Sequence, residues 1–322
     1  MLGGCVVGCG AIGPIHAAAL KKRGSLSAVC DISAEKIKDY DVQKYTSFDR
    51  ALSDGDFDVV HICTPHFLHA EMTKKAISAG KYVVLEKPVG ITVEQMQSLL
   101  CDKNSDKVCV MLQNRKNPCF EMLRKISDGG GYGKTVSICA FLTWHRTKEY
   151  YEADSWRGKW ATEGGALLIN QAIHTIDLIC LLGGGYESLS GGTAARVLGD
   201  VIEAEDTADA VIKMKNGSTA CFYATNCLNT NMPMRIEVSY ENGHVLSYTN
   251  GILLDIYRDD ARVICRDSMI TPGKSYWGAG HEAVINEFYD YCEGKADSYI
   301  KLTDAVDAMN VIFDMYKRGL SR

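Results

Sequence analysis

A stripe of polar side chains interrupts a segment that is otherwise small or apolar. Residues 164–179 read GGALLINQAIHTIDLI, a composition that predicts a helix buried on all sides. Within it, Asn170, His174 and Asp177 are spaced by four and three positions, so they would share one face of that helix. An imidazole exchanges a proton near neutral pH, and an amide or a carboxylate can position a neighbouring group. We interpret the stripe as part of a functional site; a core histidine with a satisfied hydrogen bond is the alternative interpretation.

A glycine-rich motif near the N-terminus predicts a phosphate cradle. The apolar segment 5–8 leads into GCGAIG, where Gly8, Gly10 and Gly13 have the spacing of the dinucleotide-binding fingerprint. The first glycine permits a tight turn, the second lets the backbone approach a pyrophosphate, and the third lets helix and strand pack closely. The following residues predict a helix that ends at Gly24 and whose N-terminus would face the phosphates. An accidental glycine turn is the alternative, but the place of the motif between a strand and a helix favours dinucleotide binding.

The next expected strand, LSAVCD, ends in an acid that bears on the choice of cofactor. Asp31 lies about 20 residues beyond the glycines, where a carboxylate suits the two ribose hydroxyls and repels a 2′-phosphate. The next basic residue is Lys36, so no cation follows immediately to accept that phosphate. The sequence therefore favours NAD over NADP.

Strands and helices continue to alternate as far as residue 115, which predicts a doubly wound parallel sheet with its ligand at the carboxyl ends of the strands. Those ends carry Thr64-Pro65, Glu86-Lys87-Pro88 and Gln113-Asn114-Arg115. Lys87, held between a buried strand and a proline, would lie where a nicotinamide binds, although a solvated lysine in a turn is the simpler interpretation. The residues expected to bind the cofactor are Gly8, Gly10, Ala11, Ile12, Gly13, Asp31, Thr64, Pro65, His69, Glu86, Lys87 and Gln113.

Composition excludes several other classes of protein. The 322 residues are 46% hydrophobic and 23% charged with a net charge of −5, as expected of a globular protein with no nucleic-acid partner. No apolar run approaches the roughly 20 residues that span a bilayer, and no cationic leader precedes the glycine motif, so a cytoplasmic location is expected.

Neither the cysteines nor the histidines predict a metal site. The thirteen cysteines are scattered singly without a C-x-x-C pair, which predicts free thiols in a reducing compartment. His61, His66 and His69 have a superficial ligand spacing, but their segment reads as a strand, a turn and the start of a helix. We therefore expect no metal.

With these motifs in view, the chain resembles the Gfo/Idh/MocA oxidoreductase family, which includes glucose–fructose oxidoreductase and inositol dehydrogenase. The resemblance lies in GCGAIGPIHAAAL, ICTPHFLHAEMTKKAISAGKYVVLEKPVG, WRGKWATEGGALLINQAIHTIDLICLLGG and GHEAVINEFYDYCEG. It implies an α/β protein with an NAD-binding Rossmann domain over residues 1–118 and a substrate-binding and oligomerisation domain over residues 119–322. The second domain would hold an open, mostly antiparallel sheet, and the last helix could pack back on the Rossmann domain. The family also implies a homodimer or homotetramer formed through that sheet.

The second sheet is expected from segments that alternate or run apolar. These are TVSICAFLTW, TADAVIKMKNGSTACFYATN, RIEVSYENGHVLSYTN and ILLDIYRDD, with hairpin turns at the Asn-Gly pairs 216–217 and 242–243.

The resemblance implies hydride transfer between a secondary alcohol of a sugar or related polyol and C4 of the nicotinamide. His174 would act as general base, and Lys87 would stabilise or protonate the same oxygen. Asn170 stands where many relatives, inositol dehydrogenases among them, have Asp, and an amide can only position the substrate. The N-Q-x-I-H form is similar to the branch that contains UDP-N-acetylglucosaminuronate 3-dehydrogenases and uncharacterised sugar oxidoreductases, some of which recycle NADH with 2-oxoglutarate. Asp177 would orient a neighbour or cap a hydrogen-bond network rather than contact the substrate.

Substrate contacts are further expected from EYYEADSWRGKW and from the end of the last Rossmann strand. Arg157 would clamp a carboxylate or phosphate, or else form a structural salt bridge. Arg115 would contact the substrate or orient Glu86. The residues expected to bind the substrate are Asn170, Arg157, Trp156, Tyr151 and Arg115, with Tyr150, Trp144, His145 and Arg146 as weaker candidates. A non-catalytic NAD-binding regulator and a reductase of a non-sugar carbonyl are the alternative functions.

Overall fold

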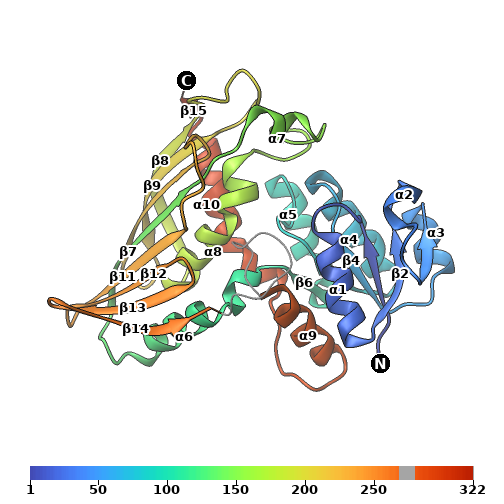
Figure 1. Cartoon of the computed structure of the whole chain (residues 1–322), viewed down its shortest axis with the longest axis horizontal. Helices are drawn as coiled ribbons and strands as arrows, with labels where there is room; N and C mark the ends of the chain where they lie inside the picture. The colour runs from blue at the N-terminus through green and yellow to red at the C-terminus, as the bar shows by residue number, and fades with distance from the viewer. Residues whose placement is uncertain (268–279, 322) are drawn as a thin grey trace. The chain divides into compact units, whose positions relative to one another are not determined.

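The computed structural model describes residues 1–267 and 280–321, which form two compact units (Figure 1). The first unit comprises Met1–Gln113 and Gly280–Ala305, and the second comprises Asn114–Ala279 and Val306–Arg322. The expected division at residues 118 and 119 therefore differs from the structure in two respects. The chain passes from one unit to the other at residue 113, and the segment that returns to the first unit is 280–305 rather than the last helix.

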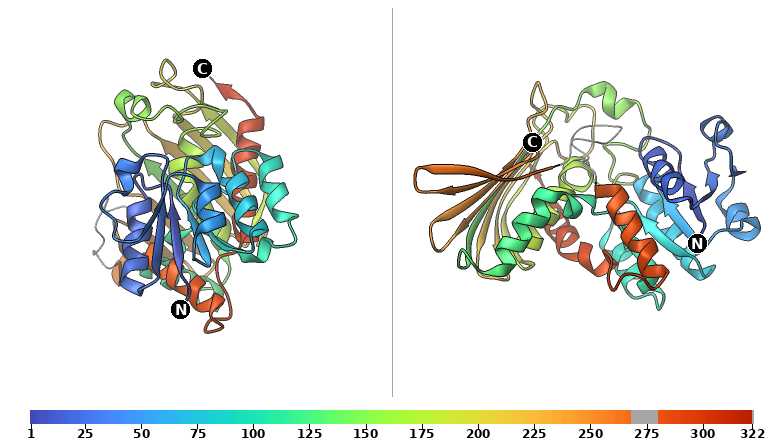
Figure 2. Two further views of the ribbon diagram at one scale, coloured as in Figure 1. Left: turned by 90° about the vertical axis from the view of Figure 1, so that its right-hand side faces the viewer. Right: turned by 60° about the horizontal axis from the view of Figure 1, so that its bottom comes forward.

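The first unit is built on a parallel sheet of six strands in the order β3-β2-β1-β4-β5-β6, which confirms the predicted doubly wound architecture. Its strands are β1 (Gly4–Val7), β2 (Leu26–Cys30), β3 (Gln43–Tyr45), β4 (Val59–Ile62), β5 (Tyr82–Leu85) and β6 (Val108–Val110). The helices are α1 (Gly13–Arg23), α2 (Ala34–Ile37), α3 (Phe48–Asp54), α4 (His69–Ser78), α5 (Val93–Leu100) and α9 (Gly280–Cys292). Short 3₁₀ turns lie at His66–Leu68, Ser105–Lys107 and Leu302–Ala305. Helices flank the sheet in the side view (Figure 2).

The sequence of each central strand explains its place in this sheet. Strands β1 and β4 are short runs that are buried at every position, as strands covered on both faces must be. Helix α1 ends where predicted, because Gly24 adopts a left-handed φ of 80° and its N–H bonds to the carbonyl groups of the last turn.

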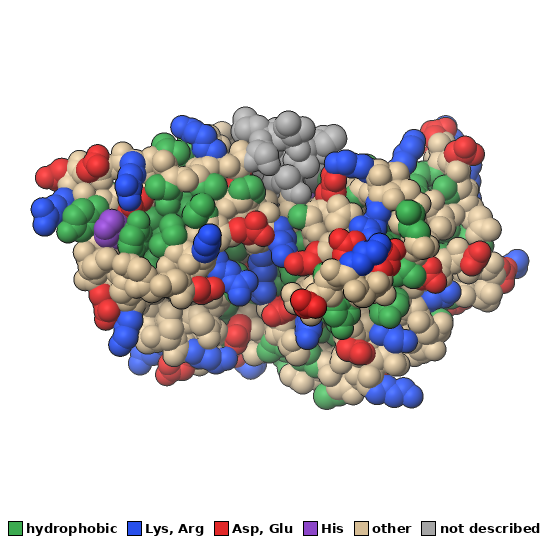
Figure 3. Space-filling model, turned by 90° about the horizontal axis from the view of Figure 1, so that it is seen from below, with side chains coloured by type: hydrophobic (Ala, Val, Ile, Leu, Met, Phe, Trp, Pro, Cys, Tyr) green, Lys and Arg blue, Asp and Glu red, His purple; other side chains and the backbone are tan. Residues whose placement is uncertain are grey.

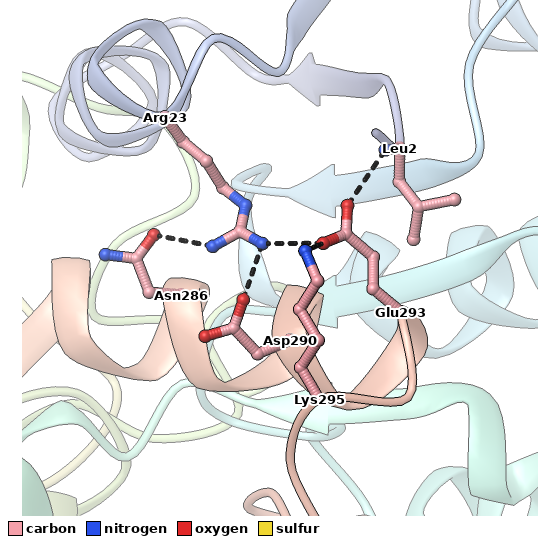
Figure 4. Close-up of polar contacts among 6 residues, drawn as sticks. All are labelled: Leu2, Arg23, Asn286, Asp290, Glu293 and Lys295. Atoms are coloured by element: carbon pink, nitrogen blue, oxygen red, sulfur yellow. Dashed lines mark hydrogen bonds and ion pairs between the residues drawn. The ribbon is translucent and has the colours of Figure 1, made fainter.

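Helix α9 belongs to the first unit because it packs on α1, far from it in sequence. Arg23, the last residue of α1, donates hydrogen bonds to Asn286 (3.2 Å), Asp290 (2.7 Å) and Glu293 (3.2 Å) of this late segment (Figure 4). The Arg23 guanidinium also lies 5.2 Å from the centre of the Tyr289 ring. Its side chain is only 15% exposed, so these are partly desolvated contacts that stabilise more than a surface ion pair does.

The second unit is built on an open sheet of nine strands in the order β14-β13-β12-β11-β7-β10-β9-β8-β15. All pairs are antiparallel except β7 with β10 and β8 with β15, so the predicted open, mostly antiparallel sheet is confirmed. The strands are β7 (Thr135–Thr143), β8 (Tyr186–Ala194), β9 (Thr207–Met214), β10 (Thr219–Thr225), β11 (Arg235–Tyr240), β12 (His244–Thr249), β13 (Ile252–Tyr257), β14 (Asp260–Arg266) and β15 (Leu320–Ser321). Both predicted Asn-Gly turns are present, with φ of 87° at Gly217 and 88° at Gly243.

Helices cover one face of this sheet, and among the described residues none forms a helix over the other face, which we call the bare face (Figure 1). They are α6 (Pro118–Gly129), α8 (Ile173–Leu182) and α10 (Val306–Lys317), and the unit also contains the short helix α7 (Lys148–Glu152) away from the sheet. A 3₁₀ turn at Gln113–Lys116 lies where the chain passes from the first unit to the second. Burial alternates along β9, where Ile212 is buried and Val211 is exposed. Tyr223 of β10 is exposed as well, and hydrophobic side chains gather on the surface of the second unit in the space-filling view (Figure 3).

All thirteen cysteines lie within the described residues, and every one is a free thiol. Among the described helices, none is both long and apolar enough to cross a membrane.

Candidate active site

The three glycines of the fingerprint meet different surroundings. Gly8 has a φ of 92°, and a Cβ there would lie 2.6 Å from the carbonyl oxygen of Cys63. A Cβ on Gly13 would lie 2.1 Å from the carbonyl oxygen of Gly8, which explains the close approach of α1 to β1. A Cβ on Gly10 would meet nothing within 4 Å. Gly10 is exposed and lies just before the N-terminus of α1, where open space is what a pyrophosphate requires.

Asp31 is fixed by backbone donors on both sides. Its Oδ2 accepts a hydrogen bond from the N–H of Cys9 (2.8 Å) and its Oδ1 accepts one from the N–H of Ser33 (2.9 Å). The residue is 7% exposed and lies directly after β2. A carboxylate held in this way keeps further lone pairs for the two hydroxyls of a ribose.

The end of β4 is joined to the loop after β5 by a buried histidine. The ring nitrogens of His69 lie 2.7 Å from the carbonyl oxygen of Pro88 and 2.8 Å from that of Thr64. His69 is 1% exposed and holds these two loops together, and its expected contact with the cofactor stays a prediction. Thr64 and Pro65 themselves are half-buried at the carboxyl end of β4, where the cofactor is expected.

Glu86, which directly precedes Lys87, is held by two buried histidines. Its Oε1 lies 2.9 Å from Nε2 of His16, and Nε2 of His281 lies 3.7 Å away on the other side. Burial by itself would raise the pKa of Glu86, but the hydrogen bond and charge of His16, helped by His281 and Lys87, lower it to about 2. Glu86 is 5% exposed and ionised at neutral pH, and its expected contact with the cofactor stays a prediction. Lys87 itself is half-buried.

This anchor continues inward as a chain of buried groups. Nδ1 of His16 lies 2.9 Å from Nδ1 of His61, and Nε2 of His61 lies 3.1 Å from the hydroxyl of Tyr289. Burial lowers the pKa of His61 well below its usual value and that of His281 to about 4, so both rings are neutral. The sequence reasoning missed His16 and His281; the signal available was a polar ring on the apolar face of a helix in each case.

The ligand atoms of His16, Glu86 and His281 lie within 4.8 Å of one another, close enough to consider a metal ion. The Glu86 oxygen already accepts a hydrogen bond from His16, and the charge of Lys87 lowers the pKa of both Glu86 and His281. A neighbouring positive charge of this kind disfavours a second cation, so we interpret the cluster as a hydrogen-bond network.

In the second unit, the polar stripe lies on a helix whose first part is irregular. Residues Leu167–Ala172 form a π-helix that continues into α8, whereas the sequence predicted a regular helix. Single π-turns inside helices are frequent at functional sites. Asn170 and His174 are half-buried and Asp177 is 1% exposed.

A buried glutamate holds the start of this helix. Oε1 of Glu205 accepts hydrogen bonds from the N–H of Leu168 (2.8 Å), the N–H of Ala166 (3.4 Å) and the hydroxyl of Tyr316 (2.9 Å). Glu205 is 0% exposed, and burial raises its pKa to about 7. Gly165 lies against the same tyrosine, because a Cβ there would be 2.0 Å from its oxygen.

Asp177 forms a bidentate ion pair with Arg115. The Nε and Nη2 atoms of Arg115 donate to the two carboxylate oxygens at 2.8 and 2.6 Å, and both side chains are largely buried. Asp177 therefore orients a neighbour, as expected. This geometry assigns two of the Arg115 donors to the ion pair, and the expected contact of Arg115 with the substrate or with Glu86 stays a prediction.

The predicted sugar-binding loop is tied to the same helix, because Nε2 of Gln171 donates a hydrogen bond to the hydroxyl of Tyr150 at 3.1 Å. Arg157 donates from Nε to Asp154 (2.8 Å) and from Nη1 to the hydroxyl of Tyr150 (2.7 Å), with its guanidinium 4.6 Å from the centre of the Trp156 ring. The structural salt bridge is thus present, and Arg157 is 16% exposed. Tyr151 is 4% exposed, and its hydroxyl accepts a hydrogen bond from Asn226 (2.9 Å).

The other expected residues occupy the following places. Ala11 is exposed and Ile12 half-exposed beside Gly10, and Gln113 is 4% exposed at the end of the first unit. Arg146 stacks between Trp144 and Tyr150, with ring centres 4.9 and 5.2 Å from its guanidinium, and Nδ1 of His145 bonds to the carbonyl of Leu228. Because Lys87 lies in the first unit and His174 in the second, their cooperation stays a prediction.

Comparisons with known proteins match both units. The family described as "Oxidoreductase family, NAD-binding Rossmann fold" matches residues 3–114, and the "GFO/IDH/MocA C-terminal domain" matches residues 120–246. The uncharacterized oxidoreductase YrbE of Bacillus subtilis is 28% identical over 249 residues, which cover 72% of this chain and 70% of YrbE.

Two further similarities concern a dehydrogenase named for levoglucosan and a dehydrogenase solved in complex with UDP-GlcNAcA. Levoglucosan dehydrogenase of Pseudarthrobacter phenanthrenivorans is 26% identical over 244 residues, which cover 67% of this chain and 62% of that protein. The crystal structure of the WlbA dehydrogenase from Bordetella pertussis, in complex with NADH and UDP-GlcNAcA, superposes with a TM-score of 0.82 over 98% of this chain and 95% of that one, at 24% identity. The fingerprint, the two sheets and the two family matches together assign the chain to the Gfo/Idh/MocA family of NAD-binding oxidoreductases.

Proposed function

We propose that this oxidoreductase transfers a hydride between a secondary alcohol of a sugar, nucleotide sugar or related polyol and C4 of a nicotinamide. The observation that carries the proposal is Lys87, a half-buried lysine that directly follows a buried, anchored carboxylate at the carboxyl end of β5. A pure binding module needs no such residue beside its cofactor cradle.

NAD is the proposed cofactor. The open space at Gly10 and the N-terminus of α1 fit a pyrophosphate, and the fixed carboxylate of Asp31 fits ribose hydroxyls and repels a 2′-phosphate. The bound nicotinamide supplies the hydride acceptor, or the donor in the reverse direction.

The proposed acid–base groups are His174 and Lys87. His174 takes the hydroxyl proton as the alcohol is oxidised, because an imidazole has a pKa near the operating pH. Lys87 donates a hydrogen bond to the same oxygen and stabilises its developing negative charge. Asn170 positions the substrate, and the stacked Trp156 and Arg157 present an aromatic face and a cation beside it.

The substrate class follows from the same residues and from the similar proteins. A levoglucosan dehydrogenase and a dehydrogenase that binds UDP-GlcNAcA support a sugar or nucleotide sugar rather than a simple carbonyl compound. We also propose a homo-oligomer formed through the bare face of the nine-stranded sheet, where Val211 and Tyr223 are 49% and 38% exposed.

The test is the change in NADH absorbance on a panel of free hexoses, inositols, UDP-sugars and UDP-uronates, with NAD or NADP and with or without 2-oxoglutarate. We expect turnover within one substrate class. Lys87→Ala and His174→Ala should each lower kcat/KM by about 10²–10⁴-fold, because each removes a positioned proton donor or acceptor.

The matched control is Lys103→Ala, which removes an exposed lysine of the same unit and should leave the rate unchanged. NADH binding, followed by its fluorescence, should persist in His174→Ala. Full activity in Lys87→Ala, or no turnover by wild-type protein that binds NADH, would contradict the proposal.

A further inference from the structure

Glu163 joins the predicted sugar-binding loop to the polar stripe. Its Oε1 accepts a hydrogen bond from Nδ2 of Asn170 at 2.5 Å, and its Oε2 accepts one from the backbone N–H of Gly158. Gly158 directly follows Arg157, and a left-handed φ of 69° with Ile202 packed against its Cα leaves no room for a side chain there. Glu163 is 0% exposed. One buried carboxylate therefore fixes both the end of the loop and the amide of the stripe.

The hydrogen bonds determine which of these groups donates and which accepts. A carboxylate that receives a backbone N–H at one oxygen and a side chain at the other is an acceptor at both. The group on residue 170 that faces it must be a donor, which an amide supplies and an ionised aspartate does not. The positive charge of Arg157 also acts on Glu163. Burial by itself would lower the pKa of Arg157, but its interactions with Tyr150, Asp154 and Glu163 together raise it.

We propose that Glu163 is a positioning residue of the substrate site, holding the Asn170 amide and the Trp156–Arg157 loop in one fixed arrangement. This inference rests on the proposed function for its catalytic consequence. It also gives a reason for the amide at position 170. An aspartate there would place two carboxylates 2.5 Å apart in a buried site, and like charges at that distance cannot both ionise.

The carboxylate of residue 163 and the amide of residue 170 can be exchanged by mutation. This exchange separates the effect of the hydrogen bonds from that of side-chain size. In Glu163→Gln, the new side chain has one acceptor but faces two donors, so one contact is lost. In Asn170→Asp, two acceptors face each other. In the double variant, the glutamine oxygen can accept from Gly158 while its amide donates to the carboxylate introduced at position 170, so both contacts return with one bond reversed.

The first measurement is the thermal midpoint of the four proteins between pH 5 and pH 9. Asn170→Asp should lose stability relative to wild type as the pH rises, because the added carboxyl must ionise beside Glu163. The double variant should lose that dependence. Glu187→Gln, an exposed glutamate on β8, is the matched control and should follow wild type. If the effects of the two single changes simply add, the inference is overturned.

The second measurement is steady-state kinetics on the substrate found with the panel. Glu163→Gln and Asn170→Asp should each lower kcat/KM by about 10²-fold through misplacement, with the Kd of NADH unchanged, and the double variant should recover at least about tenfold. Coupled stabilities without any wild-type turnover would support the contact while rejecting the proposed function. Turnover that is unaffected by Glu163→Gln would reject the positioning role alone.

Discussion

Two glycines of one motif perform separable tasks at the residue scale. Gly13 makes room for the backbone of Gly8, whereas Gly10 leaves space in front of the N-terminus of α1. Both positions look alike in the sequence, because each is simply a glycine of G-x-G-x-x-G. Only the atoms around them distinguish a glycine that packs against the backbone from one that faces open space.

Alanine at each position should separate folding from cofactor binding. Gly13→Ala forces a Cβ to 2.1 Å from a backbone oxygen, so we expect a loss of about 1–3 kcal/mol or more in the free energy of unfolding. Gly10→Ala should change that free energy by less than about 0.5 kcal/mol but weaken NADH binding. Chemical denaturation and NADH fluorescence titration measure the two effects, and equal destabilisation by both changes would refute this division.

At the scale of elements, the helix that carries Asn170 and His174 begins on a buried acid. Glu205 accepts two backbone N–H groups and a tyrosine hydroxyl with one oxygen, and its Oε2 is buried without a partner among the described residues. Burial raises the pKa of Glu205 from 4.5 to about 7. Because folding raises this pKa, the protonated Glu205 carboxyl contributes stability that is fully present below pH 4.5. That contribution is lost as the pH rises through about 7.

Glu205→Gln should therefore remove a pH dependence. A glutamine oxygen still accepts from Leu168 and Ala166 but cannot ionise, so relative to wild type the variant gains up to about 3 kcal/mol between pH 4.5 and pH 8. Urea denaturation at several pH values measures this difference, with Glu187→Gln as the exposed control. Parallel pH profiles for wild type and variant would show that Glu205 does not titrate in this range.

At the scale of the whole molecule, the open sheet presents a face that its own helices leave bare. Val211 lies opposite Cys221 of β10 and Ser190 of β8, so all three share the uncovered face. Tyr223 of β10 is exposed on the same face, and a group of neighbouring exposed apolar side chains is typical of a surface that another chain covers.

Val211→Glu should disrupt the proposed oligomer, because association would bury an unpaired charge. Light scattering after gel filtration should give a multiple of 35.4 kDa for wild type and 35.4 kDa for the variant. Val136→Glu is the control, since this 51% exposed valine of β7 shares the parity of Ile138, which faces the helices. A monomeric wild-type protein would contradict the prediction.

The sequence alone determined the features that depend on neighbouring residues. Glycine spacing predicted the cradle, the order of strands and helices predicted the parallel sheet, and the Asn-Gly pairs predicted two hairpins, because backbone conformation is restricted locally. The spacing of Asn170, His174 and Asp177 also predicted their shared helix, though not its π-helical start.

Only the tertiary structure decided which polar groups are partners. His16 meets Glu86 across 70 positions, Arg115 meets Asp177 across 62, and helix α9 joins the first unit through Arg23. These contacts showed that His69 and Glu86 are held by buried partners, and they identified Glu163 and Glu205 as supports of the helix. The physical reason is that a buried polar group must find a partner wherever the fold brings one, and no local pattern records that choice.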